Sequence, residues 1–230
     1  MGHIVSKEGI RIDPERLKAI QQLSLPMSKL GVRSFFGQIN FTRRFVLDFY
    51  KITKRIVDMM KGNTNFKWKM EGKASFEQTK YVISNAPTLS YPLFSKDFHL
   101  YCYASENTLS AILTQPDKDN VEAPIAFMSI PLKKHELKYS LIEKNACALV
   151  RVVKQLRFYI LNSHSKVFVP NLVVKTILTQ QEISVNKRAS WIDNVQEYDL
   201  DIKPTKIFRG KGLCKAIAEG SSRNEEEVEK

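Results

Sequence analysis

The sequence predicts an α/β fold in which a small helical segment precedes a sheet with flanking helices. Apolar residues recur at helical spacing in the first third of the chain, and the spacing changes to strand-like alternation near residue 98. Three strand-like segments then precede a long helical segment, and a strand, two helices and a final strand complete an α/β order. The 230 residues, 43% of them apolar and 26% charged, are enough to bury a core.

Three helices are predicted in the first third of the chain. Asp13 and Pro14 begin the first one, because an aspartate accepts amide hydrogen bonds at the N-cap and proline suits the first helical position. Ser28 is expected to cap the second helix, in which apolar residues recur at i, i+3, i+4 and i+7. The third helical stretch is predicted from Phe45 to Met60.

One more helix and the sheet follow a polar break at residues 61–65. Ser75 is predicted to cap that helix, and Pro87 is predicted to end it. Three sequential strands joined by short polar turns favour an antiparallel meander. These strands are expected at 98–104, 109–115 and 124–129. The later elements are a helix at 135–161, a strand at 167–169, helices at 173–179 and 187–196, and a strand at 199–202.

Positive charge is concentrated at the start of the chain. The net charge is +12, and residues 1–75 carry 15 basic against 6 acidic side chains. Such a field attracts polyanions, of which nucleic acid is the commonest, although an ordinary solvated helix face is the alternative. The expected nucleic-acid-binding residues lie off the apolar stripe of the helices: Arg43, Arg44, Lys51, Lys54 and Arg55.

No targeting or membrane-spanning pattern is evident in the sequence. No stretch approaches the roughly 20 apolar residues that a membrane helix needs, and the first ten residues do not resemble a signal peptide. We therefore expect an intracellular protein, cytoplasmic or nuclear, without a membrane partner. No feature of the sequence sets an oligomeric state.

Short strings in a fixed order along residues 2–219 resemble a known family. Those of the first third include Asp13-Pro14-Glu15, Val32-Arg33-Ser34-Phe35-Phe36-Gly37, Arg43-Arg44-Phe45 and Asp48-Phe49. Those beyond it include Phe66-Lys67-Trp68, Ala86-Pro87-Thr88-Leu89, Lys138-Tyr139-Ser140 and Gln196-Glu197-Tyr198-Asp199. Together they resemble the Pol polyprotein of gypsy-type LTR retrotransposons, from the reverse transcriptase thumb or connection segment through the RNase H-like domain.

The resemblance implies an RNase H-like mixed sheet with flanking helices, preceded by a small helical segment. Residues 1–70 then correspond to a thumb or connection segment, 71–220 to the RNase H-like domain and 221–230 to a disordered acidic tail. Some plant elements of this type resemble the present strings closely, and in them the decayed domain resembles a connection or scaffold. The family's polymerase palm domain carries paired aspartates for its own two metal ions, and this sequence has no Asp-Asp pair. The palm domain is therefore expected to be missing from this sequence and to be a partner of it.

Catalysis in the family depends on carboxylates that this sequence lacks. RNase H-type hydrolysis holds two Mg²⁺ ions on clustered carboxylates, which activate water and stabilise the leaving oxygen. By resemblance, Tyr103 replaces the aspartate of the first strand and Asn145 replaces the second glutamate of the Glu-Lys-Glu motif. Pro170 replaces the aspartate after the fourth strand, and the last aspartate falls near Lys215. None is a hard anionic ligand, so we expect no catalytic residue, no metal site and no cofactor, although active members use Mg²⁺.

Neighbouring acidic residues are not expected to replace these ligands. Glu143 lies two positions from Asn145, about 200° around a helix, and therefore points away from the face that a metal needs. The other carboxylates are scattered over different predicted elements: Asp97, Glu106, Asp193, Asp199 and Asp201.

Three functional hypotheses follow. The first is a catalytically inactive RNase H-like connection module that binds an RNA–DNA hybrid or duplex through its basic first third. The second is a residual ribonuclease acting on RNA–DNA hybrids through carboxylates that the motifs do not reveal. The third is a non-functional relic of a retroelement, whose basic face once docked against the palm domain. The first predicts salt-sensitive binding without cleavage, and the second predicts cleavage that a chelator abolishes.

Overall fold

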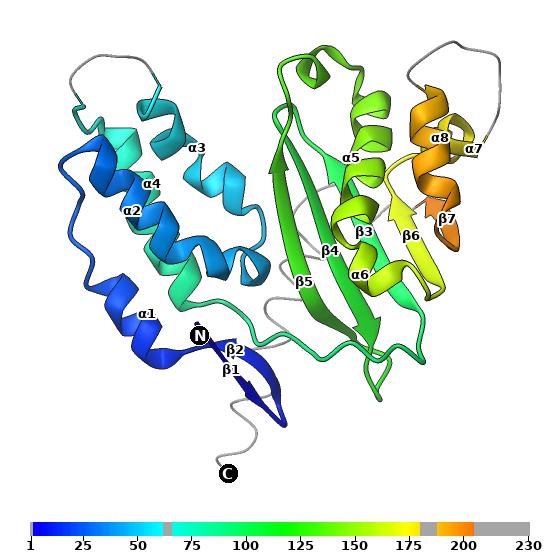
Figure 1. Ribbon diagram of the computed structural model, residues 1–230, viewed down its shortest axis with the longest axis horizontal. Helices are drawn as coiled ribbons and strands as arrows, with labels where there is room; N and C mark the ends of the chain where they lie inside the picture. Colours follow the sequence, from blue (N-terminus) through cyan, green and yellow to red (C-terminus); the bar gives the residue numbers. More distant parts are fainter. Residues whose placement is uncertain (1, 62–65, 180–187, 205–230) are drawn as a thin grey trace.

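The computed structural model describes residues 2–61, 66–179 and 188–204, which form two parts lying side by side (Figure 1). One part, called here the helical unit, contains a short hairpin and helices α1 to α4 within residues 2–84. The other is a five-stranded sheet with helices α5 to α8. The predicted fold class, a mixed sheet with flanking helices behind a small helical segment, is confirmed.

The strands of the sheet lie in the order β5-β4-β3-β6-β7. Strands β3 (Phe98–Ala104), β4 (Thr108–Pro116) and β5 (Glu122–Pro131) form the predicted antiparallel meander. Strand β6 (Ser165–Val169) lies parallel to β3, and β7 (Leu200–Pro204) lies parallel to β6. Parallel neighbours need crossover connections, which the helices provide. Helices α7 and α8, between β6 and β7, span Val173–Thr179 and Arg188–Gln196.

The prediction of one continuous helix at 135–161 is wrong. The structure has a 3₁₀ turn, η2 (Glu136–Lys138), then α5 (Leu141–Gln155) and a short α6 (Arg157–Ile160). Ser140 begins α5 in a capping box: its hydroxyl accepts from the Glu143 amide, and the Glu143 carboxylate accepts from the Ser140 amide. Two donors that a helix start leaves unsatisfied are thereby bonded, so a new helix begins here.

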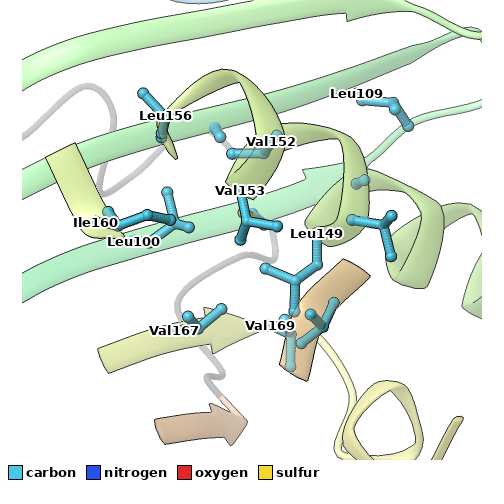
Figure 2. Packing of buried hydrophobic residues seen from close by; sticks show 14 of the residues in the cluster. Leu100, Leu109, Leu149, Val152, Val153, Leu156, Ile160, Val167 and Val169 are labelled. Atoms are coloured by element: carbon cyan, nitrogen blue, oxygen red, sulfur yellow. The ribbon is translucent and has the colours of Figure 1, made fainter. Parts of the chain in front are cut away.

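Helix α5 covers one face of the sheet. Figure 2 shows Leu149, Val152 and Val153 of α5 packed over Leu100 of β3 and Val167 of β6, and all five side chains are buried. Because side chains alternate along a strand, successive residues of β3 contribute to opposite faces. The core under α5 contains Phe98, Leu100 and Cys102, whereas Tyr101 belongs to the core on the opposite face.

The helical unit provides the second core. Its Phe35, Ile39 and Phe45 pack in one cluster with Ile112 of β4 and Phe127 of β5. The apolar stripes predicted for its helices are therefore buried, partly against the sheet. Within this unit the elements are β1 (His3–Ser6), β2 (Gly9–Ile12), α1 (Pro14–Gln21), α2 (Lys29–Ile39), the 3₁₀ helix η1 (Asn40–Phe45), α3 (Phe49–Met59) and α4 (Met70–Ser84).

The predicted helix starts at Asp13 and Ser28 are confirmed. The Asp13 carboxylate accepts from the Glu15 amide at 2.9 Å, and the Ser28 hydroxyl accepts from the Gly31 amide at 3.1 Å. The β1–β2 hairpin was not predicted. It is held at Ile10. The Ile10 amide donates to the Leu89 carbonyl at 2.7 Å, and the Leu89 amide donates to the Ile10 carbonyl at 2.8 Å.

Two predicted helix starts in the helical unit are wrong. Helix α3 begins at Phe49 rather than Phe45, because η1 runs to Phe45 and Asp48 adopts a left-handed conformation with φ 54°. Ser75 does not cap a helix but lies inside α4, where its hydroxyl donates to the Ile52 carbonyl of α3 at 2.5 Å. A serine in this position ties two helices together instead of starting one.

Helix α4 packs within the helical unit, against α1 and α3. Its Phe76 and Ile83 are fully buried in that unit's core. The division of the chain at residues 70 and 220 stays a prediction, and the acidic tail 221–230 lies outside the described residues. In the part of the chain that the structure describes, no helix is both long and apolar enough to cross a membrane.

Candidate functional site

The ends of the parallel strands β3 and β6 bring together three of the four positions that the resemblance predicts to correspond to metal ligands. Tyr101 pairs with Phe168 in the parallel register. Tyr103 and Pro170, each two residues further on, therefore lie at the same edge of the sheet, the one formed by the carboxyl ends of β3 and β6. Asn145 reaches this edge from α5, where its amide oxygen accepts from the Ala104 amide at 2.7 Å. Lys215, the fourth position, lies outside the described residues.

Asn145 has a structural partner rather than an open coordination position. The side chain is buried, at 5% exposure, in the second turn of α5. Its oxygen bonds to the main chain of β3, so the amide joins the helix to the sheet. Beside it, the Lys144 ammonium donates to the Glu106 carbonyl at 3.1 Å, which places a positive charge near this edge. A cation there opposes the binding of a metal ion.

Tyr103 points to the face of the sheet opposite α5 and contacts the helical unit. Its hydroxyl donates to Oδ1 of Asp48 at 2.9 Å. The Ser110 hydroxyl of β4 donates to the same oxygen at 2.5 Å. Asp48 was missed by sequence reasoning, because it lies 55 residues from Tyr103 in the chain and no spacing rule joins the two. Only the three-dimensional packing of the helical unit on the sheet reveals the pair.

Pro170 ends β6 and offers no side-chain donor atom. It is exposed, and the next residue, Asn171, accepts from the Val173 amide at 2.9 Å through its side chain. This bond organises the turn into α7. The position therefore directs the chain from strand to helix.

The donor groups at this edge do not fit the two Mg²⁺ ions of the active family. Mg²⁺ requires near-octahedral coordination by hard oxygen ligands, usually carboxylates. Tyr103 supplies a neutral phenol that donates to Asp48, Asn145 supplies a neutral amide already bonded to the main chain, and Pro170 supplies nothing. Among the residues that the structure describes, no three His, Cys, Asp or Glu side chains gather closely enough to hold a metal.

Most of the carboxylates considered as substitutes are engaged elsewhere. Asp97 pairs with Lys166 at 2.9 Å, Asp199 with His164 at 2.9 Å and Asp201 with Lys203 at 2.8 Å. The hydrogen bond from Lys166 lowers the pKa of Asp97, and that from Lys203 lowers the pKa of Asp201. Glu143 belongs to the capping box of α5, and Asp193 is exposed on α8.

The predicted nucleic-acid-binding residues separate into two groups. Lys51, Lys54 and Arg55 share one side of α3, away from its buried residues, and we call them the basic stripe. Lys54 pairs with Asp58 at 2.7 Å, and Arg55 lies 3.3 Å from Glu71. Both pairs are solvent-accessible, so they contribute little and can exchange their partners.

Asp58 lies at the end of the basic stripe and moderates its charge. Burial by itself would raise the pKa of Asp58, but hydrogen bonds from Lys54 and Lys61 outweigh burial and lower it. The carboxylate is therefore ionised at neutral pH. Lys51 stays exposed on the same side of the helix.

The two arginines of η1 differ in accessibility. Arg43 is exposed, with its guanidinium 5.4 Å from the centre of the Phe49 ring at the start of α3. Arg44 is half-buried, and its Nη2 donates to the Tyr159 hydroxyl of α6 at 3.4 Å. Its Nε is buried and has no hydrogen-bond partner within the described residues. Arg44 therefore joins the helical unit to α6 and is less accessible than Arg43.

Comparison with known proteins agrees with this architecture. Residues 68–167 match the family model of the RNase H-like domain found in reverse transcriptase. The chain is 29% identical to the retrovirus-related Pol polyprotein from transposon opus and 31% identical to that from transposon 297, both of Drosophila melanogaster. Each alignment covers 97% of this chain but only 23% and 20% of the polyproteins.

A fission yeast relative and two solved structures extend the comparison. The transposon Tf2-3 polyprotein of Schizosaccharomyces pombe is 25% identical over all of this chain and 17% of its own length. The foamy viral protease-reverse transcriptase dRH in complex with double-stranded DNA has a TM-score of 0.78 at 19% identity, over 92% of this chain and 38% of the other. The foamy viral enzyme with an RNA/DNA hybrid has a TM-score of 0.77 at 20% identity, over 93% and 29%.

These likenesses differ in what they show. At such low identity the solved structures show the fold alone. The sequence relatives share ancestry with almost the whole chain, which spans about a fifth of their length. Residues 68–167 of this protein are therefore an RNase H-like domain of the kind found in reverse transcriptase, and the homologues of the chain include Pol polyproteins of retrotransposons.

Proposed function

We propose that this chain is a catalytically inactive RNase H-like connection module that binds nucleic acid, in particular an RNA–DNA hybrid. The basic region of its helical unit makes the contact. The polymerase palm domain is the protein partner that we propose for the same unit. In this view residues 1–70 have the position of a thumb or connection segment, and the sheet serves as a scaffold.

The chemistry at the ends of β3 and β6 is the observation that carries the proposed inactivity. Hydrolysis by two Mg²⁺ ions needs at least one carboxylate that bridges both metals and others that hold each one. Tyr103 and Asn145 use their polar atoms in protein hydrogen bonds, and Pro170 has none to offer. A phenol with a hydroxyl bound to Asp48 cannot act as a bridging carboxylate.

Charge and exposure support the proposed binding. Residues 1–75 hold the excess of basic side chains, and α3 presents Lys51, Lys54 and Arg55 on one accessible side. Lysine and arginine on one helix side can follow a phosphate backbone without reading base sequence. The foamy viral enzyme with the same fold is described in complex with an RNA/DNA hybrid, which makes the hybrid the first ligand to test.

One assay tests both halves of the proposal. A labelled RNA–DNA hybrid is titrated with the chain in Mg²⁺ or Mn²⁺, across a salt series, with a chelator control. We expect anisotropy to show binding that weakens steeply with salt, because neutralised phosphates release counterions, and gels to show intact RNA.

Each other outcome has a defined meaning. Metal-dependent cleavage that the chelator abolishes would establish a residual ribonuclease and refute the proposed inactivity. A folded chain that neither binds nor cleaves would refute the proposed binding and favour a relic. Equal affinity for a double-stranded DNA of the same length would keep the binding but remove the preference for a hybrid.

A further inference from the structure

A row of polar side chains crosses three strands on the face of the sheet that carries the helical unit. Tyr103 of β3 pairs in register with Ser110 of β4, and Ser110 pairs with Ser129 of β5. Residues paired in this way project on the same face of an antiparallel sheet. The three hydroxyl groups therefore form a line across the meander, perpendicular to its strands.

All three hydroxyl groups bond to the junction between η1 and α3. Tyr103 and Ser110 donate to the same carboxylate oxygen of Asp48, at 2.9 and 2.5 Å. The Ser129 hydroxyl accepts from the Tyr50 amide, in the first turn of α3, at 3.1 Å. Since these bonds lie beside the apolar core shared by the helical unit and the sheet, their geometry sets one relative position of the two parts.

The backbone at Asp48 is adapted to this contact. Its φ of 54° is left-handed, a conformation that costs most residues energy but that aspartate and asparagine tolerate. The Asp48 side chain makes no capping bond to α3, although it lies at the N-cap position. The carboxylate is directed at the sheet instead of at its own helix.

We infer that Asp48, Tyr103, Ser110 and Ser129 form a junction anchor that fixes the direction of α3 relative to the sheet. Tyr103, which the resemblance places at the family's first metal-ligand position, is thus a positioning residue. The anchor itself does not depend on nucleic acid. By fixing α3, the anchor also holds the basic stripe in a set direction for binding a hybrid. This consequence rests on the proposed function.

Hydrogen exchange on the full chain tests the anchor directly. The probes are the amides of Tyr50, which bonds to Ser129, and Ile52, which bonds to the Asp48 carbonyl at 3.1 Å. Replacing Tyr103 by phenylalanine removes one hydroxyl and leaves the ring. We expect exchange at both probes to accelerate about tenfold in Tyr103→Phe, the effect of losing one hydrogen bond to a charged group. The matched control is Tyr81→Phe, an exposed tyrosine of α4, which should change nothing.

Three variants of Asp48 separate the side-chain bonds from the backbone conformation. Glycine adopts a positive φ without strain, so Asp48→Gly removes only the bonds to Tyr103 and Ser110. Asp48→Ala removes them and adds strain, so it should accelerate exchange further. Asp48→Asn keeps an acceptor oxygen and tolerates the conformation, so it should have the smallest effect of the three.

Two results would overturn the anchor. One is exchange at Tyr50 and Ile52 within about twofold of the wild-type rate in both Tyr103→Phe and Asp48→Gly. The other is equal acceleration at amides of α5, such as Val153, which would show general destabilisation instead of local release. Hybrid affinity is measured on the same variants. If the wild type binds no hybrid, the proposed function fails while the exchange result still decides the anchor.

Discussion

Asn145, which the resemblance places at a ligand position of the family, illustrates how a polar side chain can stabilise the sheet. Its amide oxygen accepts from the Ala104 amide, and the Asn145 side chain is buried whereas Ala104 is half-buried. We expect Asn145→Ala to leave that amide unsatisfied and to lower the free energy of unfolding by about 1–3 kcal/mol. Urea unfolding of the full chain measures this free energy. The control is Gln78→Ala, at an exposed residue of α4. An unchanged urea midpoint would show that water or a rearranged group satisfies Ala104.

Glu122 makes stability depend on acid. Burial alone would raise its pKa, but hydrogen bonds from His99, Thr114 and Tyr101 outweigh burial and lower the pKa below the usual 4.5. A carboxylate with a lowered pKa in the folded state contributes stability that is complete above the unfolded-state value and is lost as pH falls through the folded-state value. The contribution should therefore be full above about pH 4.5 and be lost as pH falls through the lowered pKa of the folded state.

The variant Glu122→Gln tests this dependence. At pH 7 it should be less stable than the wild type by roughly 1.5–3 kcal/mol, because bonds to a charged acceptor are lost. As pH falls below about 4.5 the difference between the two proteins should shrink. Thermal unfolding followed from pH 7 to pH 3 provides the measurement. A difference that stays constant over that range would assign the effect to packing and not to charge.

At the scale of single residues, the sequence reveals only part of the candidate site. Tyr103, Asn145 and Pro170 could be placed by their motifs, since each lies at a fixed point in a recognisable string. Asp48 could not, because its partner is distant in the chain and its left-handed backbone leaves no local pattern. The inward turn of Arg44 was equally hidden, since exposed and half-buried arginines look alike in a helical pattern.

Among the elements, α3 carries the prediction about binding. The triple variant Lys51→Ala, Lys54→Ala, Arg55→Ala keeps the helix, because alanine is the best helix former. Each phosphate contact contributes about 0.9 to the slope of log affinity against log salt, so losing three should reduce the slope by about 2.7. Anisotropy with a labelled hybrid over a salt series measures the slope.

The control for the basic stripe is Lys118→Ala. Lys118 is exposed in the turn between β4 and β5, outside the helical unit, and its loss removes a positive charge without touching α3. A slope that changes equally per charge in both variants would mean that binding follows net charge and not the basic stripe.

Local patterns predicted the elements well where a single cause determines them. Strand β3 and helix α7 have the predicted bounds, since alternation and helical periodicity respectively are undisturbed there. The predictions failed where a competing local bond intervened. The capping box at Ser140 divides the predicted long helix, and Ser75 bonds to Ile52 instead of capping α4. The β1–β2 hairpin was missed because its support comes from Leu89, far along the chain.

On the scale of the whole molecule, the two parts share an apolar core. Tyr101, Ile112 and Phe127 of the sheet are buried against the helical unit. We expect a fragment of residues 71–230 to expose this face, since it lacks α1, α2 and α3. Such a fragment should bind a hydrophobic dye strongly and associate on gel filtration, whereas the full chain should not. A monomeric fragment without dye binding would show that the sheet closes its own surface.

The pairing of Ile10 with Leu89 has a consequence for the order of events during synthesis. Domains fold as the chain leaves the ribosome, and contacts between distant residues must wait for the later one. The β3–β4–β5 meander needs only short turns, so it can form soon after it emerges. The β1–β2 hairpin cannot gain its contact with Leu89 until that residue has been made. Because Leu89 precedes Phe98, the first residue of β3, the hairpin can be secured before the strands of the meander have been synthesised.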